Sequence, residues 1–86
     1  MDQVNWPEIF SNQTKEIIDL LNSEGLSPDA TDLYRALRGG STGSEVWGGV
    51  RACLYKIPVE RISASTKEKI FKLIEDINSK YGNYFS

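Results

Sequence analysis

The glycine-rich turn from Gly39 to Glu45 is the stretch of the sequence that most resembles a site for chemistry. It reads Gly-Gly-Ser-Thr-Gly-Ser-Glu and runs directly into an apolar segment. Backbone N–H groups at the start of a helix attract anions, so such a turn could cradle a phosphate. A nucleotide-binding P-loop requires a following lysine and a preceding strand; this turn has neither, and Glu45 would repel a phosphate. We therefore interpret its hydroxyl residues as helix caps.

Few residues in the chain are suited to catalysis or metal binding. Histidine is absent, which removes the commonest general base and the commonest metal ligand. The single cysteine, Cys53, lies on the apolar face of a predicted helix, where we expect a buried small hydrophobic side chain rather than a nucleophile. The acid pairs Asp29/Asp32 and Glu75/Asp76 fit solvated helix faces and have no third ligand at a metal-binding spacing. We predict a protein that is not an enzyme and that binds neither a metal nor another cofactor.

Charge is distributed unevenly along the 86 residues. Residues 1–34 contain seven acidic residues and one basic residue, a net charge of −6, whereas residues 35–86 contain nine basic and five acidic residues, a net charge of +4. An asymmetry of this size indicates a charged partner. The alternative is that the two halves attract each other within the fold, and the sequence leaves both interpretations open.

Apolar residues at helical spacing, together with capping signals, predict four amphipathic helices. Capping boxes precede three of them, and Ser27 is the predicted cap of the remaining one; the boxes are Asn5–Glu8, Thr42–Glu45 and Ser65–Glu68. Gly25 supplies a left-handed stop after the first helix. Gly48 and Gly49, inside the third helix, indicate a close approach of a neighbouring helix. The predicted helices cover residues 6–23, 28–38, 43–57 and 66–81.

These elements predict an all-α fold, a compact four-helix bundle that occupies residues 1–86 as a single domain with short connections. No segment alternates as a half-buried strand would. No apolar run is long enough to span a membrane, and the N-terminus is unlike a signal peptide. One cysteine cannot form an internal disulfide. We therefore expect a cytoplasmic protein that does not enter the membrane.

The chain has more aromatic residues than a core of this size readily buries. Some of them are expected to be exposed, and exposed aromatic side chains are typical of protein interfaces. Trp47 and Tyr55 are candidate anchors for a partner, although Trp47 fits the core equally well. The residues in question are Trp6, Trp47, Tyr55, Tyr84 and Phe85.

The turn from Gly39 to Glu45, followed by a short apolar helix and an amphipathic C-terminal helix, resembles small bacterial immunity proteins. These are encoded beside contact-dependent or polymorphic toxins, and some are compact helical proteins with a Gly-Gly-Thr-Gly-Ser-Glu-like turn, which Ser41 interrupts here. The resemblance covers about residues 33–81. It implies a protein that binds one toxin domain in the cytoplasm of the producing cell and blocks its active site or its access to substrate.

Our hypothesis from the sequence is a non-enzymatic immunity protein that neutralises a basic toxin domain, such as a nuclease. Nucleases are usually basic because they bind a polyphosphate, and an acidic surface would attract such a partner. The alternative is a helical adaptor that binds nucleic acid through Arg35, Arg38 and Arg51, which is less expected because three arginines are a small footprint on an acidic chain. The predicted partner-binding residues are Glu16, Asp19, Glu24, Asp29, Asp32, Trp47 and Tyr55.

Overall fold

The computed structural model describes residues 5–40 and 42–82, which fold into four α-helices and one short 3-10 turn. No strand occurs within these residues, so the predicted all-α fold is confirmed. None of the helices in these two ranges combines the length and the apolarity that a bilayer crossing demands. The elements are α1 (Trp6–Ser23), α2 (Ser27–Gly39), α3 (Gly43–Lys56), η1 (Val59–Arg61) and α4 (Ala64–Tyr81).

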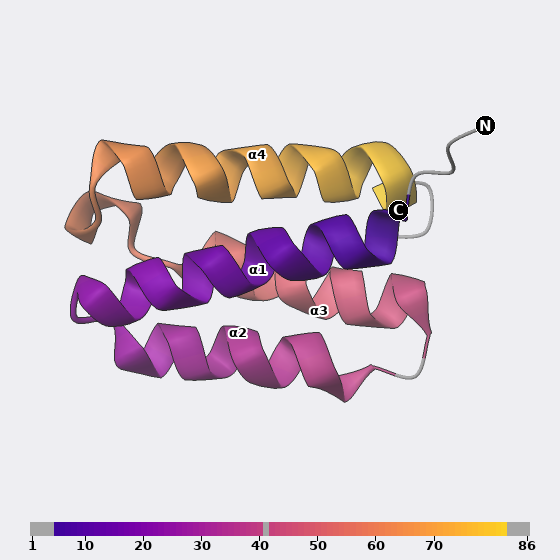
Figure 1. The fold of residues 1–86 in the computed structure, drawn as a ribbon, viewed down its shortest axis with the longest axis horizontal. Coiled ribbons are helices and arrows are strands. Elements are labelled where there is room, and N and C mark those ends of the chain that lie inside the picture. The colour runs from indigo at the N-terminus through magenta and orange to yellow at the C-terminus, as the bar shows by residue number, and fades with distance from the viewer. Residues whose placement is uncertain (1–4, 41, 83–86) are drawn as a thin grey trace.

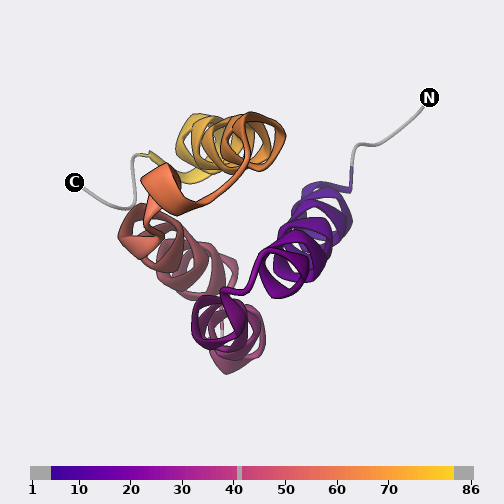
Figure 2. The same cartoon turned by 90° about the vertical axis from the view of Figure 1, so that its left-hand side faces the viewer.

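The helices form an up-down-up-down bundle in which each helix runs antiparallel to the one before it (Figure 1). Seen along the bundle, they follow one another around a ring (Figure 2). Helix α1 packs against α2 and α4, and α3 packs against the same two helices. Short connections enforce three of these four contacts. The contact between α1 and α4 joins the two ends of the chain and closes the ring.

The core contains an aromatic group centred on Phe10 of α1, which is completely buried. Its ring packs edge-on against Trp47 of α3, with 5.3 Å between the ring centroids. The centroid of the Tyr81 ring of α4 lies 6.4 Å from that of Phe10. Trp47 retains only 4% of its surface exposed, so the expectation that it could anchor a partner is wrong and the core alternative holds. Aliphatic side chains complete the core; they are Ile17, Leu21, Leu26, Ala30, Leu33, Val50, Leu54, Ile57, Ile70, Leu73, Ile74 and Ile77.

Helix α1 has the predicted bounds because its capping signals are used as expected. The backbone N–H of Glu8 donates to the Asn5 side chain at 3.2 Å. At the other end Gly25 adopts a left-handed conformation, with φ of 83°. The N–H of Leu26 then donates to the carbonyl of Leu21 at 2.8 Å, which is the hydrogen bond of a Schellman motif. Helix α2 follows so closely that Leu26 takes the N-cap position, and Ser27, the predicted cap, begins the helix.

The bounds of α3 and α4 differ slightly from the prediction. Helix α3 begins at Gly43, with Thr42 as its cap, but it ends at Lys56 because Ile57 is extended before Pro58. Helix α4 begins at Ala64, two residues early, because its cap is Ser63 and not Ser65. The hydroxyl of Ser63 accepts from the backbone N–H of Thr66 at 3.2 Å. The predicted cap Ser65 is therefore wrong, and a tertiary contact of Ser63 described below favours the earlier start.

The close backbone approach expected at the glycines occurs mainly in the turn between α2 and α3. A Cβ atom on Gly40 would lie 2.6 Å from the backbone nitrogen of Val46, closer than packing allows. Gly49 does face the neighbouring helix, as predicted, but a Cβ atom there would lie 3.7 Å from that of Ala36, an ordinary contact. The turn therefore depends on Gly40, whereas α3 has room for a methyl group at Gly49.

We expect Gly40→Ala to destabilise the protein by about 1–3 kcal/mol, because the added methyl group overpacks the first turn of α3. Gly39→Ala is the matched control, since a Cβ atom at Gly39 would meet nothing within 4 Å. Urea unfolding followed by circular dichroism measures both. Equal stability of the two variants would contradict the proposed packing role of Gly40.

Candidate partner-binding site

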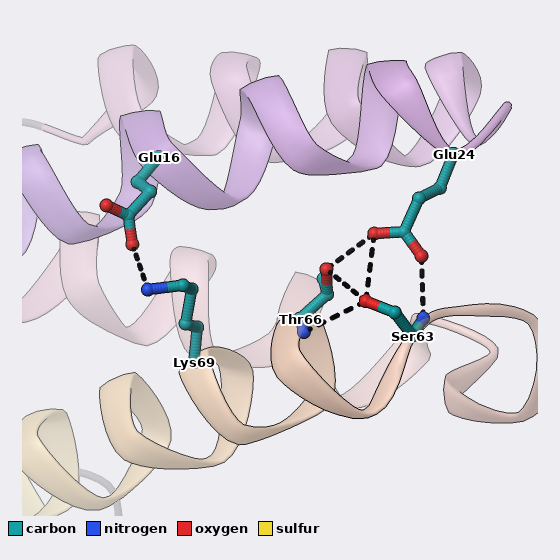
Figure 3. Close-up of polar contacts among 5 residues, drawn as sticks. All are labelled: Glu16, Glu24, Ser63, Thr66 and Lys69. Atoms are coloured by element: carbon teal, nitrogen blue, oxygen red, sulfur yellow. Dashed lines mark hydrogen bonds and ion pairs between the residues drawn. The ribbon is translucent and has the colours of Figure 1, made fainter.

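Glu16, a predicted partner-binding residue, faces α4 and forms an ion pair there. Its carboxylate lies 2.8 Å from the Nζ atom of Lys69, and the two side chains are 57% and 43% exposed (Figure 3). An exposed pair of this kind contributes at most about 1 kcal/mol. The pair nevertheless joins the acidic N-terminal third to the basic C-terminal part of the chain. It therefore agrees with the interpretation that the two halves attract each other within the fold.

Glu24, a second predicted partner-binding residue, connects the end of α1 to the start of α4 by hydrogen bonds. We call this set of hydrogen bonds the Glu24 clip. Its carboxylate accepts a hydrogen bond from the backbone N–H of Ser63 at 2.6 Å and another from the hydroxyl of Thr66 (Figure 3). The hydroxyl of Ser63 lies 3.5 Å from the same carboxylate. Thr66 is completely buried, so its hydroxyl needs this acceptor. Glu24 is therefore a structural residue, and its assignment to a partner surface is corrected.

The amide of Gln13 links the middle of α1 to α4. Its Nε2 atom donates to Asp76 at 3.1 Å, and Asp76 also pairs with Lys72 at 3.0 Å. The hydrogen bond and the charge of Asp76 raise the pKa of Lys72. Between the Gln13 and Glu24 contacts a cleft of about 300 Å³ opens along the α1–α4 interface. It is lined by Gln13, Glu16, Ile17, Ser65, Glu68, Lys69 and Lys72.

Asp29 and Asp32 lie elsewhere, in a hollow of about 320 Å³ between α2 and α3. Basic side chains line the same hollow, so it does not present a purely acidic surface. Cys53 is half-buried there, less deeply than predicted, and its thiol donates to the carbonyl of Asp32 at 3.7 Å. Burial raises the pKa of the thiol, with a further contribution from the charge of Asp32, which makes it a poor nucleophile. The hollow is lined by Asp29, Asp32, Arg35, Cys53 and Lys56.

The predicted acidic surface is thus divided among separate parts of the molecule. Glu16 and Glu24 face α4, while Asp29 and Asp32 line the α2–α3 hollow. Asp19 is exposed on α1. The charge asymmetry of the sequence is therefore partly used inside the fold. Glu16, Asp19 and Asp32 are the exposed members of the predicted acidic set, and Glu16 is paired with Lys69.

The three arginines of the alternative hypothesis lie on two helices, Arg35 and Arg38 on α2 and Arg51 on α3. Arg51 of α3 donates to Asn78 of α4 at 2.6 Å, whereas Arg35 lines the hollow between α2 and α3. Arg38 donates to the hydroxyl of Tyr34 at 2.6 Å on the exposed side of α2. Each of the three thus has a contact within the fold or lines a hollow that also contains acidic residues.

Two large aromatic side chains are exposed on the side of the bundle formed by α3 and α4. Tyr55 is 60% exposed and Phe71 is 52% exposed. The guanidinium of Arg51, bonded to Asn78, lies 5.5 Å from the centroid of the Tyr55 ring, so Tyr55 is on the α4 side of α3. Phe71 is seven residues from Asn78 and therefore shares its helix face, toward α3. The sequence analysis named Tyr55 and missed Phe71.

The exposure of Phe71 had a signal in the sequence. It directly follows Ile70, which is completely buried, and consecutive residues in an α-helix point about 100° apart. Ile70, Leu73, Ile74 and Ile77 already supply the buried stripe of α4, so an aromatic residue beside that stripe should be exposed. Tyr84 and Phe85, also named among the surplus aromatic residues, lie outside the described residues.

The turn from Gly39 to Glu45 joins α2 to α3 and places its described polar groups at a helix cap. The backbone N–H of Glu45 donates to the hydroxyl of Thr42 at 3.3 Å, as the predicted capping box requires; Ser41 lies outside the described residues. Across residues 5–40 and 42–82, no three or more acidic or cysteine side chains are grouped as metal ligands.

Comparison with known proteins gives no match: no family model, no curated protein sequence and no solved structure is significantly similar to the chain. Function must therefore be argued from the surface of the molecule itself.

The Glu24 clip makes stability depend on pH. The hydrogen bonds from Thr66 and from the Ser63 backbone lower the pKa of Glu24 below its ordinary value of 4.5. A lowered pKa in the folded state stabilises the fold above about pH 4.5, and this contribution disappears as pH falls through the folded-state pKa. We expect the thermal unfolding midpoint of Glu24→Gln to fall less between pH 7 and pH 3 than that of the wild type.

Thr66→Val, which removes the donor to Glu24, should move the acid-induced loss of stability to higher pH, and Thr66→Ser should restore the wild-type profile. Scanning calorimetry at several pH values makes the comparison. Identical pH profiles for Glu24→Gln and the wild type would contradict the role of the clip.

Proposed function

We propose that the protein is a non-enzymatic binding module for another protein, and specifically an immunity protein that neutralises a toxin domain encoded beside it. The observation that carries this proposal is the pair of exposed aromatic side chains, Tyr55 and Phe71, on the α3–α4 side of the bundle. Neither ring belongs to the buried core, so the core gives no reason for aromatic residues at these positions. Exposed aromatic side chains are enriched in protein interfaces.

The surroundings of these residues fit an interface. Arg51 stacks over the Tyr55 ring and is held by Asn78, so its stem and the ring form one surface between the two helices. Tyrosine and arginine are the residue types that most often contribute large shares of binding energy. The immunity function itself rests on the resemblance of the turn from Gly39 to Glu45 and the helices that follow it. The nucleic-acid alternative is less favoured because Arg51 is bonded to Asn78 and Arg35 lines a hollow that also contains Asp29 and Asp32.

Co-expression with the product of the neighbouring gene tests the proposal. We expect the two proteins to co-purify and the neighbour to be toxic when expressed alone. We expect Tyr55→Ser combined with Phe71→Ser to weaken the complex by about 1,000-fold, because two buried anchors of about 2 kcal/mol each contribute about 4 kcal/mol together. Calorimetric titration measures this loss.

Tyr34→Ser is the matched control, since Tyr34 is also exposed, at 46%, but lies on α2. Unfolding midpoints of all variants establish that each one folds. A complex that resists the double substitution, or that Tyr34→Ser weakens equally, would place the interface elsewhere. A harmless neighbour that does not bind would overturn the immunity function, and a shift of generic DNA or RNA at low salt would favour the alternative.

The charge of the partner has its own test. If the partner is basic, neutralising the exposed acids with Asp19→Asn and Asp32→Asn should slow association with the neighbouring gene product by about threefold to tenfold at low salt. The difference should shrink at 0.5 M salt because exposed charges are then screened. Glu60→Gln, which changes an exposed acid on η1, is the control. Stopped-flow association rates that do not respond to salt or to the substitutions would exclude a role for these acids.

A further inference from the structure

Charges of opposite sign lie on either side of Phe71 along α4. Lys67, Phe71 and Glu75 are four residues apart in the sequence, and residues at this spacing are neighbours on one side of a helix. Phe71 and Glu75 are exposed, and Lys67 is half-buried. The three residues therefore form a row that is basic, aromatic and acidic in turn, over about 12 Å of helix.

The fold leaves both charges of this row without a direct partner. The ammonium of Lys67 and the carboxylate of Glu75 make no ion pair and no hydrogen bond within the part of the chain that the structure describes. The about 12 Å of helix between them is too long for the two groups to pair with each other. Glu75 acts on Lys72 only through its charge, since the ammonium of Lys72 binds Asp76.

We propose that this row is the contact between two copies of this chain. In a two-fold symmetric contact, residue i of one copy meets residue j of the other, and j meets i. A two-fold axis beside Phe71 and perpendicular to α4 sets the two α4 helices antiparallel. Lys67 of each copy then faces Glu75 of the other copy, and the two Phe71 rings meet at the centre.

The charges select this orientation of the two copies. A parallel pair of α4 helices would set Lys67 against Lys67 and Glu75 against Glu75, and like charges in contact are unfavourable. The antiparallel row is complementary to itself and needs no further residue for its charges to match. This property favours a second copy over an unrelated protein as the occupant of the row.

The helix surface also suits such a contact. Rows of residues four apart run side by side when two helices cross at about 50°, the commonest angle of helix packing. Tyr55 is exposed on the same side of the bundle, so each copy adds a second ring near the contact. One row on one helix is nevertheless a small area, and we expect a weak dimer that exchanges with monomers.

This inference goes beyond the proposed function, because it concerns the protein in the absence of its partner. The second copy and the neighbouring gene product would cover the same two rings, Tyr55 and Phe71. The two complexes should therefore exclude each other, and a weak dimer would give way to a tighter complex with the partner.

Sedimentation velocity of the full chain tests for the dimer. We expect the weight-average sedimentation coefficient to rise between about 10 µM and 1 mM protein, as a weak dimer requires. Lys67→Glu and Glu75→Lys, each alone, should weaken self-association about tenfold, because each turns two attractive pairs into repulsive ones. An equimolar mixture of these two variants should associate as the wild type does, since both pairs of the mixed dimer again join opposite charges.

Lys15→Glu is the matched control, because it changes the net charge as Lys67→Glu does but lies exposed on α1. It should leave self-association unchanged, and the chain that combines Lys67→Glu with Glu75→Lys should self-associate as the wild type does. Unfolding midpoints establish that each variant folds.

A wild type that stays monomeric up to 1 mM protein would overturn the proposal. So would a dimer that neither single reversal weakens, or a mixture of the two reversals that associates no better than each variant alone. A monomeric protein that still binds the neighbouring gene product removes the dimer alone. A dimer that responds to the charges as expected, without a neighbour complex, removes the immunity function alone.

Discussion

The contact between α1 and α4 is the constraint on which the rest of the bundle depends. Short connections place α2 beside α1 and α3 beside α2, but only tertiary interactions bring the first helix to the last. At one end Phe10 holds Trp47 and Tyr81 in an aromatic group, and at the other Glu24 binds the first turn of α4. The cleft lies along this same interface.

This closure explains why some acidic residues serve the fold and others are open to a partner. A carboxylate beside the N-terminus of a helix is favoured by the free N–H groups there, and Glu24 occupies this position relative to α4. Glu16 meets Lys69 because the two helices run antiparallel. Asp19 remains exposed, and Asp32 faces the hollow beside α3. Glu16 and Glu24 therefore hold the two halves of the chain together, whereas Asp19 and Asp32 remain for a basic partner.

Helix α4 contributes to the core, to the exposed aromatic pair and to the cleft. Its buried stripe completes the core, Phe71 lies toward α3, and Lys69 and Lys72 line the cleft toward α1. The glycine-rich turn, which attracts attention in the sequence, lies at the α2–α3 corner, where Gly40 allows the close approach of Val46.

The sequence by itself determined the local structure. The helical spacing of apolar residues, the Asn5 and Thr42 caps, the left-handed Gly25 and the block at Pro58 are signals between near neighbours in the chain, so they set the helix bounds to within two residues. Only the tertiary structure decided that Ser63 and not the predicted Ser65 caps α4, that Trp47 is buried and Phe71 exposed, and that Glu24 serves the fold. These outcomes depend on groups tens of residues apart, whose meeting is set by how the helices pack and not by their own spacing. The cleft is likewise a product of packing, because its residues come from two helices that the chain places at its opposite ends.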